Sequence, residues 1–266
     1  MTAHTPNRDA RHGPAAPPPA LVVVAHGSRD PRALATVRRL LDGVRALRPG
    51  LPVHLGHIEL NAPLLPGTLA ELDAQGTGAA VLVPLLLSRG HHVKRDIPEA
   101  AAGARLHARV AAPLGPHPLL VDALHTRLTE AGWRTPADAA ARRASGVVLA
   151  AAGSRDPEAR VDTHRTARLL AERLGVPVVP AYASAAAPTV PDALRALTAR
   201  GRSRVAVASY FTAPGRFATE CAAAAPGIAA APLGTHPAMA RLVLHRYDQA
   251  LRARTPVTGP AALLTA

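Results

Sequence analysis

The chain of 266 residues is poor in aromatic side chains, which make up 2% of it. A core built without them has to consist of Leu, Val and Ala, which suits helices packed on a sheet and disfavours an aromatic platform for single-stranded nucleic acid. Cysteine is limited to Cys221, which excludes an intrachain disulfide and a thiolate metal cluster. The lack of disulfides fits a reducing compartment, so we expect a cytoplasmic protein.

Long apolar runs are also absent. The first residues, MTAHTPNRDARHGPAAPPPA, are polar and Pro-rich where a secretory signal would need an apolar segment, and no run elsewhere is long enough to span a bilayer. We therefore expect a soluble protein that does not associate with membranes. Residues 1–19 and 255–266 lack periodicity, which predicts disordered tails.

Lysine is nearly absent, since Lys94 is the only one among 31 basic residues, yet the formal net charge is +13. Two explanations stay open: a composition biased toward Ala and Arg, or a small acidic substrate that the charge attracts. Nucleic acid is the weaker alternative, because no dense basic run and no nucleic-acid-binding motif occurs.

One stretch of the chain occurs twice. LVVVAHGSRDP spans residues 21–31 and VVLAAAGSRDP spans residues 147–157. In both, an apolar run of the kind found in buried parallel strands leads into a loop with Gly, and an Asp-Pro pair then marks the start of a helix. The repeat predicts two similar lobes.

Strand and helix signals alternate along the chain with short connections, which predicts parallel sheets covered by helices. We expect an α/β fold of two tandem, pseudo-symmetric lobes, each a four-stranded parallel sheet with flanking helices. The lobes are assigned to residues 20–132 and 146–254, joined by a polar linker at 133–145. Strands after the first are expected at residues 53–58, 80–87, 108–112, from 147, 178–182, 205–211 and 228–231. Helices are expected from 31 to 47, 63–76, from 97, 117–131, 158–174, 188–199, 216–224 and 236–252.

Three polar residues of the first half lie just past predicted strand ends: His26, Glu59 and His92, with His91 beside the last. Because open α/β sheets bind ligands at the carboxyl ends of their strands, we expect these side chains to converge. Two imidazoles and a carboxylate suit a divalent metal such as iron, cobalt or nickel, and suit proton transfer equally well. Taken one at a time, each could instead be an ordinary hydrogen-bonding residue or a solvated loop residue.

The second half repeats the loop but not these side chains. Residues 27–30, Gly-Ser-Arg-Asp, return unchanged as residues 153–156. We interpret the repeated residues as loop structure and the lost ones as a site that one copy is enough to supply. The pairs that differ are matched as His26 with Ala152, Glu59 with Ser184 and His92 with Arg216.

Three motifs together carry a resemblance to a known family. AHGSRD after the first strand, HIELNAP after the second and LLLSRGHHVKRDIPEA after the third resemble the sirohydrochlorin chelatases of the small cobaltochelatase and siroheme-ferrochelatase type, relatives of ferrochelatase. The resemblance covers both halves, from residue 20 to residue 253. It implies two α/β lobes around one cleft, a metal-free sirohydrochlorin-type tetrapyrrole bound between them, and insertion of Fe²⁺, Co²⁺ or Ni²⁺ with no further cofactor. We expect the protein to be a monomer.

Carried over residue by residue, the resemblance implies that His26 and His92 handle the metal and the protons, with Glu59 as their acidic partner. His92, and not His91, fits the family spacing Gly-x-His-Val-x-x-Asp-Ile-Pro, here residues 90–98. Arg binds carboxylates with two parallel hydrogen bonds, so loop residues near these three could hold the carboxylates around the tetrapyrrole rim. The expected substrate-binding set is Gly27, Ser28, Arg29, Ser88, Arg89, Gly90, His91 and Arg216.

Three other functions compete with this one. A serine hydrolase with Ser28 as nucleophile would need a Gly-x-Ser-x-Gly elbow, which is missing, and the Gly-Ser pair recurs in the second half without its histidine. A nucleotide-binding domain would need a Gly-x-Gly-x-x-Gly or Walker loop after Val24, and neither occurs there. A non-catalytic carrier of metal or tetrapyrrole on the same fold stays open, because motifs do not separate it from a chelatase.

Overall fold

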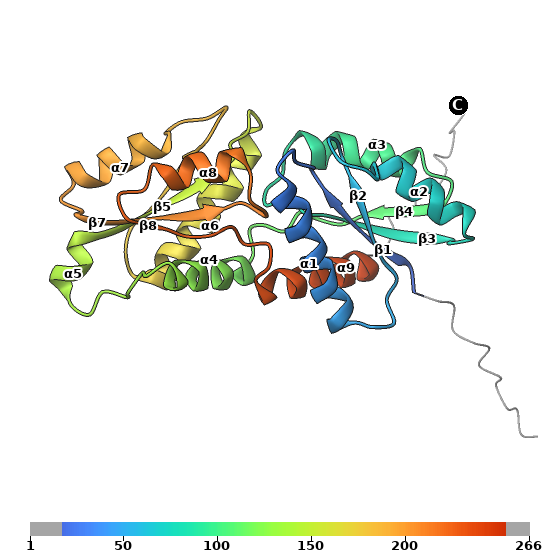
Figure 1. Cartoon of the computed structure of the whole chain (residues 1–266), viewed down its shortest axis with the longest axis horizontal. Helices are drawn as coiled ribbons and strands as arrows, with labels where there is room; N and C mark the ends of the chain where they lie inside the picture. Colours follow the sequence, from blue (N-terminus) through green and yellow to red (C-terminus); the bar gives the residue numbers. More distant parts are fainter. Residues whose placement is uncertain (1–17, 254–266) are drawn as a thin grey trace, which may run out of the picture.

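The computed structural model describes residues 18–253 and contains two four-stranded parallel sheets (Figure 1). The strand order is β2-β1-β3-β4 in the first sheet and β6-β5-β7-β8 in the second. Each sheet takes its strands from one half of the chain, so the expected pair of α/β lobes with one topology is confirmed. Of the tails expected at residues 1–19 and 255–266, all but Pro18 and Pro19 lie outside the described residues.

The first sheet consists of β1 (Ala20–Ala25), β2 (Val53–His57), β3 (Ala79–Pro84) and β4 (His107–Val110), and the second of β5 (Ser145–Ala151), β6 (Val178–Tyr182), β7 (Arg204–Tyr210) and β8 (Ile228–Ala229). The helices are α1 (Pro31–Leu47), α2 (Leu65–Ala74), the π-helical turn η1 (His92–Asp96), α3 (Ile97–Ala102), α4 (Pro118–Glu130), α5 (Ala139–Ala144), α6 (Pro157–Leu174), α7 (Val190–Ala199), α8 (Arg216–Ala223) and α9 (Pro237–Arg252). Alternation of strand and helix along the chain is therefore confirmed.

β1 is buried along its whole length because helices cover both faces of its sheet. Leu21 belongs to the core under α1 and α9, whereas its neighbour Val22 belongs to the core under α2 and α3. A strand of this kind needs an apolar run without alternation. After it, the side chain of Asp30 accepts the N–H of Arg32 and Pro31 opens α1, as the sequence predicted.

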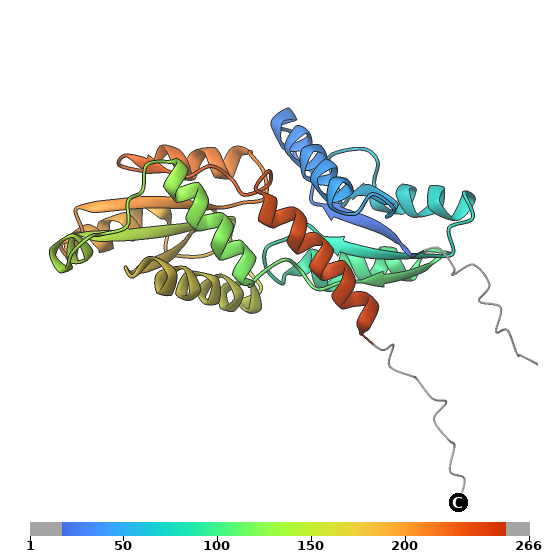
Figure 2. The ribbon, with the colours of Figure 1, turned by 90° about the horizontal axis from the view of Figure 1, so that it is seen from below.

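The last helix of each half packs on the sheet of the other half, which the sequence did not indicate. α4 packs against α6 and β7, and α9 packs against α1 and β3. Figure 2 shows α4 lying across the second lobe and α9 across the first. Both helices join one apolar core that runs through the two lobes. The lobes in space therefore do not coincide with the segments 20–132 and 146–254 expected from the sequence.

Three other stretches differ from expectation. β3 ends at Pro84 and not at residue 87: Pro84 offers no N–H to the ladder, and the pairing stops after the N–H of Leu85 has donated to the carbonyl of Val24 over 2.8 Å. The helical chain after it starts at η1, so His92 lies in a helical turn and not in a loop. The linker at 133–145 contains α5, whose first turn is capped by the side chain of Asp138.

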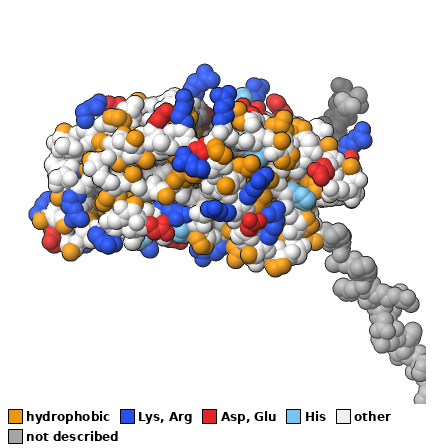
Figure 3. All heavy atoms as spheres, viewed as in Figure 1, with side chains coloured by type: hydrophobic (Ala, Val, Ile, Leu, Met, Phe, Trp, Pro, Cys, Tyr) orange, Lys and Arg blue, Asp and Glu red, His pale blue; other side chains and the backbone are white. Residues whose placement is uncertain are grey.

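The surface of the described residues mixes both charges. Figure 3 shows Lys and Arg side chains spread over both lobes on the face drawn, with Asp and Glu side chains among them. On this face the basic residues do not form one continuous stripe. Between residues 18 and 253 no helix combines the length and the apolar character needed to cross a bilayer.

Candidate functional site

His26 follows the last residue of β1 and is held by the loop after β2. Its carbonyl oxygen accepts the N–H of Glu59 over 3.0 Å, so the two loops lie side by side. Gly27 has a φ of 103°, and a Cβ there would lie 1.9 Å from the carbonyl oxygen of Glu59. Only glycine permits this close approach, which fixes the backbone of His26 relative to that of Glu59.

The three residues expected to form a site do come together. His26 Nε2 lies 3.6 Å from Glu59 Oε1, and the rings of His26 and His92 meet edge to face with centroids 4.7 Å apart. The side chains of His26 and Glu59 are 43% and 53% exposed and that of His92 is 33% exposed, so solvent reaches all three. Their convergence agrees with the sequence analysis, whereas the chemical role of each residue stays a prediction.

Asp96 joins these residues and was not among those expected. Its carboxylate is hydrogen-bonded to His92 Nδ1, and its Oδ1 lies 3.7 Å from His91 Nε2. A carboxylate only accepts hydrogen bonds, so Nδ1 of His92 is the donor in this bond, and in the neutral ring Nε2 then keeps a lone pair for a proton or a metal. The signal in the sequence is the four-residue spacing of His92 and Asp96 on a helical turn. It was missed because the helix was expected to begin only at Ile97.

The site is open and not a closed metal cage. Among residues 18–253, no three or more His, Cys, Asp or Glu side chains are grouped so that they could hold a metal ion. His26 is the shared member of two pairs, one with Glu59 and one with His92. Structural metal sites are typically closed by four protein ligands. The pairs at His26 are suited to passing a proton, and the expected metal binding by His26, His92 and Glu59 stays a prediction.

The second lobe repeats the backbone of this site without its side chains. The N–H of Ser184 donates to the carbonyl of Ala152 over 3.0 Å, as that of Glu59 does to His26. Gly153 has a φ of 93°, and a Cβ there would lie 1.8 Å from the carbonyl oxygen of Ser184. The expected matches of Ala152 and Ser184 are thus confirmed.

Gly90 and Gly215 fix the register of the third loop of each lobe. The carbonyl of each glycine accepts the N–H of the residue four positions later over 3.0 Å. A Cβ on Gly90 would lie 3.7 Å from Ser154 Oγ, and one on Gly215 would lie 3.8 Å from Ser28 Oγ. Each glycine therefore approaches the matching serine of the other lobe, and the two glycines are equivalent.

From this register, His91 corresponds to Arg216 and His92 corresponds to Phe217. The expected match of His92 with Arg216 was therefore wrong by one residue, because the sequence alone offers no bond that fixes the glycines as equivalent. Arg216 is exposed, with its guanidinium 4.6 Å from the ring centroid of Phe217 and its Nε 3.7 Å from Glu220 Oε1. The start of α8 thus places a cation and an aromatic ring where the first lobe has two imidazoles.

Ser28, Arg29 and Ser88 lie on the loops at this edge, and their part in substrate binding stays a prediction. Ser28 Oγ accepts the N–H of Asp30 over 3.1 Å, and its N–H donates to Asn61 Oδ1 over 2.7 Å. These bonds make Ser28 a turn residue, which argues against its use as a hydrolase nucleophile. Arg29 is exposed and Ser88 is half-buried.

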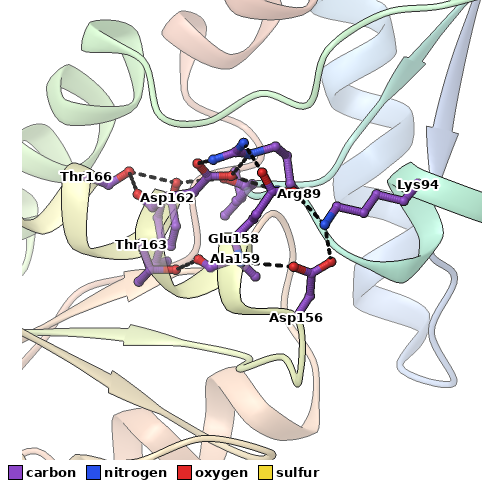
Figure 4. A network of polar contacts seen from close by, with 10 residues as sticks. Arg89, Lys94, Asp156, Glu158, Ala159, Asp162, Thr163 and Thr166 are labelled. Carbon is purple, nitrogen blue, oxygen red and sulfur yellow. Dashed lines mark hydrogen bonds and ion pairs between the residues drawn. The ribbon is translucent and has the colours of Figure 1, made fainter.

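Arg89 makes a contact that the sequence did not indicate. Its guanidinium donates to Asp162 and Glu158 of α6 in the other lobe, with N···O distances from 2.6 to 3.0 Å (Figure 4). The hydrogen bonds to Asp162 raise the pKa of Arg89. These bonds join the two lobes, and the expected binding of substrate carboxylates by Arg89 stays a prediction.

Comparison with known proteins gives a consistent picture. The family model described as CbiX matches residues 20–131 and 146–250. A sirohydrochlorin ferrochelatase of Bacillus subtilis is 31% identical over 176 residues, which cover 64% of this chain and 64% of that protein. A sirohydrochlorin cobaltochelatase of Priestia megaterium is 26% identical over 204 residues, which cover 72% of this chain and 63% of that protein. The chain thus spans less than two thirds of the length of these relatives.

Solved structures share the fold. SirB from Bacillus subtilis with Fe³⁺ has a TM-score of 0.71 at 24% identity, covering 87% of this chain and 94% of that one. The sirohydrochlorin chelatase SirB from Bacillus subtilis subspecies spizizenii in complex with cobalt has a TM-score of 0.68 at 23% identity, with 87% and 94% covered. The likeness extends over both lobes.

Proposed function

Because this chain belongs to the CbiX family, we propose that it inserts a divalent metal ion into sirohydrochlorin or a closely related tetrapyrrole. The observation that carries the proposal is the convergence of His26, Glu59 and His92 at the carboxyl edge of the first sheet. The names of the relatives, a ferrochelatase and a cobaltochelatase, support sirohydrochlorin as substrate and iron or cobalt as the metal. We place the reaction in the cytoplasm and assign it to a monomer, in which one chain supplies both lobes.

Metal insertion into a tetrapyrrole requires groups that accept protons. Insertion exchanges two pyrrole N–H protons for one M²⁺ ion, so two protons leave the macrocycle while the metal loses its water. A neutral imidazole can accept a proton or bind the metal, and Nε2 of His92 is available because Asp96 holds Nδ1. Glu59, beside His26, balances the charge of an imidazolium or passes its proton to solvent. On this proposal the metal is a substrate, and no further cofactor takes part.

The carboxylates at the tetrapyrrole rim need cations that the fold has not already paired tightly. Arg216 meets this condition, since its side chain is 75% exposed and its nearest carboxylate, that of Glu220, lies 3.7 Å away. Its neighbour Gly215 approaches Ser28 of the first lobe, which places the start of α8 beside the site. We assign Arg216, together with the exposed Arg29, to the binding of these carboxylates.

Metal insertion by the purified protein tests the proposal. Sirohydrochlorin is incubated without oxygen with Fe²⁺, Co²⁺ or Ni²⁺ in separate reactions, and the change in its absorption spectrum is followed over many turnovers. We expect at least one metal to be inserted faster than in the protein-free control, and the double variant His26→Ala, His92→Ala to lose the acceleration. Tetrapyrrole binding without turnover would instead identify a carrier on the same fold.

A further inference from the structure

Five charged residues join the two lobes in a cluster that we call the interlobe clamp (Figure 4). Arg89 bonds to Asp162 over 2.7 Å and to Glu158 over 2.6 Å, and Lys94 Nζ lies 2.6 Å from Asp156 and 2.5 Å from Glu158. Asp162 is buried, with 4% of its side chain exposed. The first lobe supplies the two cations and the second lobe supplies the three carboxylates.

The two cations of the interlobe clamp lie on either side of His92 in the chain. Arg89 lies three residues before His92, and Lys94 lies two residues after it within η1. The backbone N–H of Arg89 also donates to Asp162 over 2.9 Å, so the main chain is held as well as the side chain. The chain that presents His92 is thus anchored to the other lobe before and after this residue.

The pseudo-twofold axis relates the interlobe clamp to a second contact between the lobes, and most of the charged residues of the clamp are replaced there. The counterparts of Arg89, Lys94, Glu158 and Asp162 are Pro214, Thr219, Arg32 and Thr36. Arg32 bonds to Asp30 within its own lobe, over 2.6 to 3.2 Å. Within residues 18–253, this set of interlobe ion pairs therefore occurs on the side that carries His92 and not on the side that carries its counterpart Phe217.

We propose that the second lobe, having lost the reactive side chains, positions those of the first through the interlobe clamp. Its carboxylates hold η1 so that the ring of His92 stays edge-on to that of His26, with centroids 4.7 Å apart. Arg89 and Lys94 are positioning residues in this scheme, since they act through His92. The kinetic consequence rests on the proposed metal insertion, because a displacement of about 1 Å at a reacting group can lower a rate by about 100-fold.

Removing clamp charges without changing side-chain shape tests this inference. Lys94→Met and Asp162→Asn should each lower kcat for metal insertion by about tenfold or more, with KM for the tetrapyrrole changed by less than about twofold. Lys94→Arg, which keeps the charge, should restore most of the rate. The matched control is Asp248→Asn, which removes the charge that pairs with Arg48, at N···O distances of 2.6 and 2.9 Å, and leaves one of the two acceptor oxygens. Arg48 caps the end of α1 that is remote from the His26 loop, so this control should lower the melting temperature and leave kcat unchanged.

A second readout does not depend on activity. The protons of the His26 and His92 rings should show a nuclear Overhauser contact in the wild-type protein and in Asp248→Asn, and lose it in Lys94→Met and Asp162→Asn. Wild-type kcat and a preserved ring contact in both clamp variants would overturn the inference. If those variants only had a lower melting temperature, the clamp would stabilise the contact between the lobes without positioning His92. If the wild-type protein inserts no metal, the proposed function fails, and the ring contact still decides the role of the clamp.

Discussion

Phe217 occupies in the second lobe the position that His92 occupies in the first, as the equivalence of Gly90 and Gly215 shows. At this point the first lobe therefore carries the imidazoles of His91 and His92, whereas the second lobe carries the guanidinium of Arg216 and the ring of Phe217. A tetrapyrrole has a conjugated plane and a rim of carboxylates, so an aromatic ring with a guanidinium 4.6 Å from its centroid suits binding more than proton transfer. We therefore expect substitutions in the second lobe to change substrate binding and substitutions in the first lobe to change the rate of the chemical step.

Replacing Arg216 with Ala should weaken substrate binding without slowing the chemical step. We expect KM for sirohydrochlorin to rise roughly tenfold with kcat nearly unchanged, because the lost contact to a carboxylate is equally strong in the ground and transition states. Arg168→Ala is the matched control, since Arg168 pairs with Glu172 over 3.8 Å and Arg216 pairs with Glu220 over 3.7 Å in the same helical spacing. Steady-state kinetics measure both. If KM is unchanged in Arg216→Ala, Arg216 does not contact the substrate and is an ordinary solvated residue at the start of α8.

Replacing His92 with Ala should remove most of the activity, and replacing His91 should not. His92 contacts His26 and is oriented by Asp96, whereas the side chain of His91 is 66% exposed. We expect kcat to fall at least about 100-fold in His92→Ala, the usual range for a general base, and less than about threefold in His91→Ala. Insertion rates at saturating substrate measure the effect, and circular dichroism checks the fold. Wild-type turnover in His92→Ala would contradict the assignment of the site.

Local signals were enough to predict the elements and the meeting of the three site residues. The unbroken apolar run of β1 and the Asp30-Pro31 helix start are each encoded within a few residues, and parallel strands bring their carboxyl ends to one edge by geometry alone. The placement of His26, Glu59 and His92 therefore followed from their positions just after predicted parallel strands, without any knowledge of side-chain contacts.

Contacts between distant segments left no comparable signal. The apolar faces of α4 and α9 suit either sheet, so the sequence could not show that each packs on the sheet of the other half. The bond between Arg89 and Asp162 was not expected, because Asp162 lies 73 residues away and nothing near Arg89 in the sequence indicates it. Such pairings are decided by the packing of the lobes and not by local propensity.

The pH dependence of stability should carry a contribution from His117. Its Nδ1 accepts the N–H of Leu119 at the start of α4 over 3.1 Å, and burial, helped by the charges of Arg246 and His245, lowers its pKa from 6.5 to about 4. The folded pKa lies below the unfolded one, so the unfolded chain binds more protons between these values. This contribution to stability is therefore full above pH 6.5 and is lost as the pH falls toward about 4.

His117→Asn keeps a capping oxygen and does not titrate, so it isolates this effect. Between about pH 7.5 and about pH 5, the free energy of unfolding of the wild-type protein should fall by roughly 1 kcal/mol more than that of the variant. His236 caps α9 through the same bond, and its pKa is also lowered by burial, so His236→Asn should behave alike. Urea unfolding at both pH values measures this, and parallel changes in the wild type and His117→Asn would contradict it.

Gly27 should be a position where a single methyl group disturbs both stability and activity. A Cβ at Gly27 would lie 1.9 Å from the carbonyl oxygen of Glu59, and one at Gly153 would lie 1.8 Å from that of Ser184. Backbone strain at such angles costs about 1–3 kcal/mol, and the clash adds to it by forcing the loops apart. Gly76 has a φ of 78° with nothing within 4 Å of an added Cβ, so Gly76→Ala measures the strain alone.

We expect Gly27→Ala and Gly153→Ala to lose similar free energy of unfolding in denaturant titrations, and each to lose more than Gly76→Ala. Their effects on metal insertion should differ, because Gly27→Ala displaces the loop that carries Glu59 and separates its carboxylate from His26, 3.6 Å away. Gly153→Ala displaces Ser184, which has no titratable group, so its kcat should fall much less. If Gly27→Ala costs no more stability than Gly76→Ala and keeps wild-type kcat, the loops give way freely and their close approach does not set the geometry of the site.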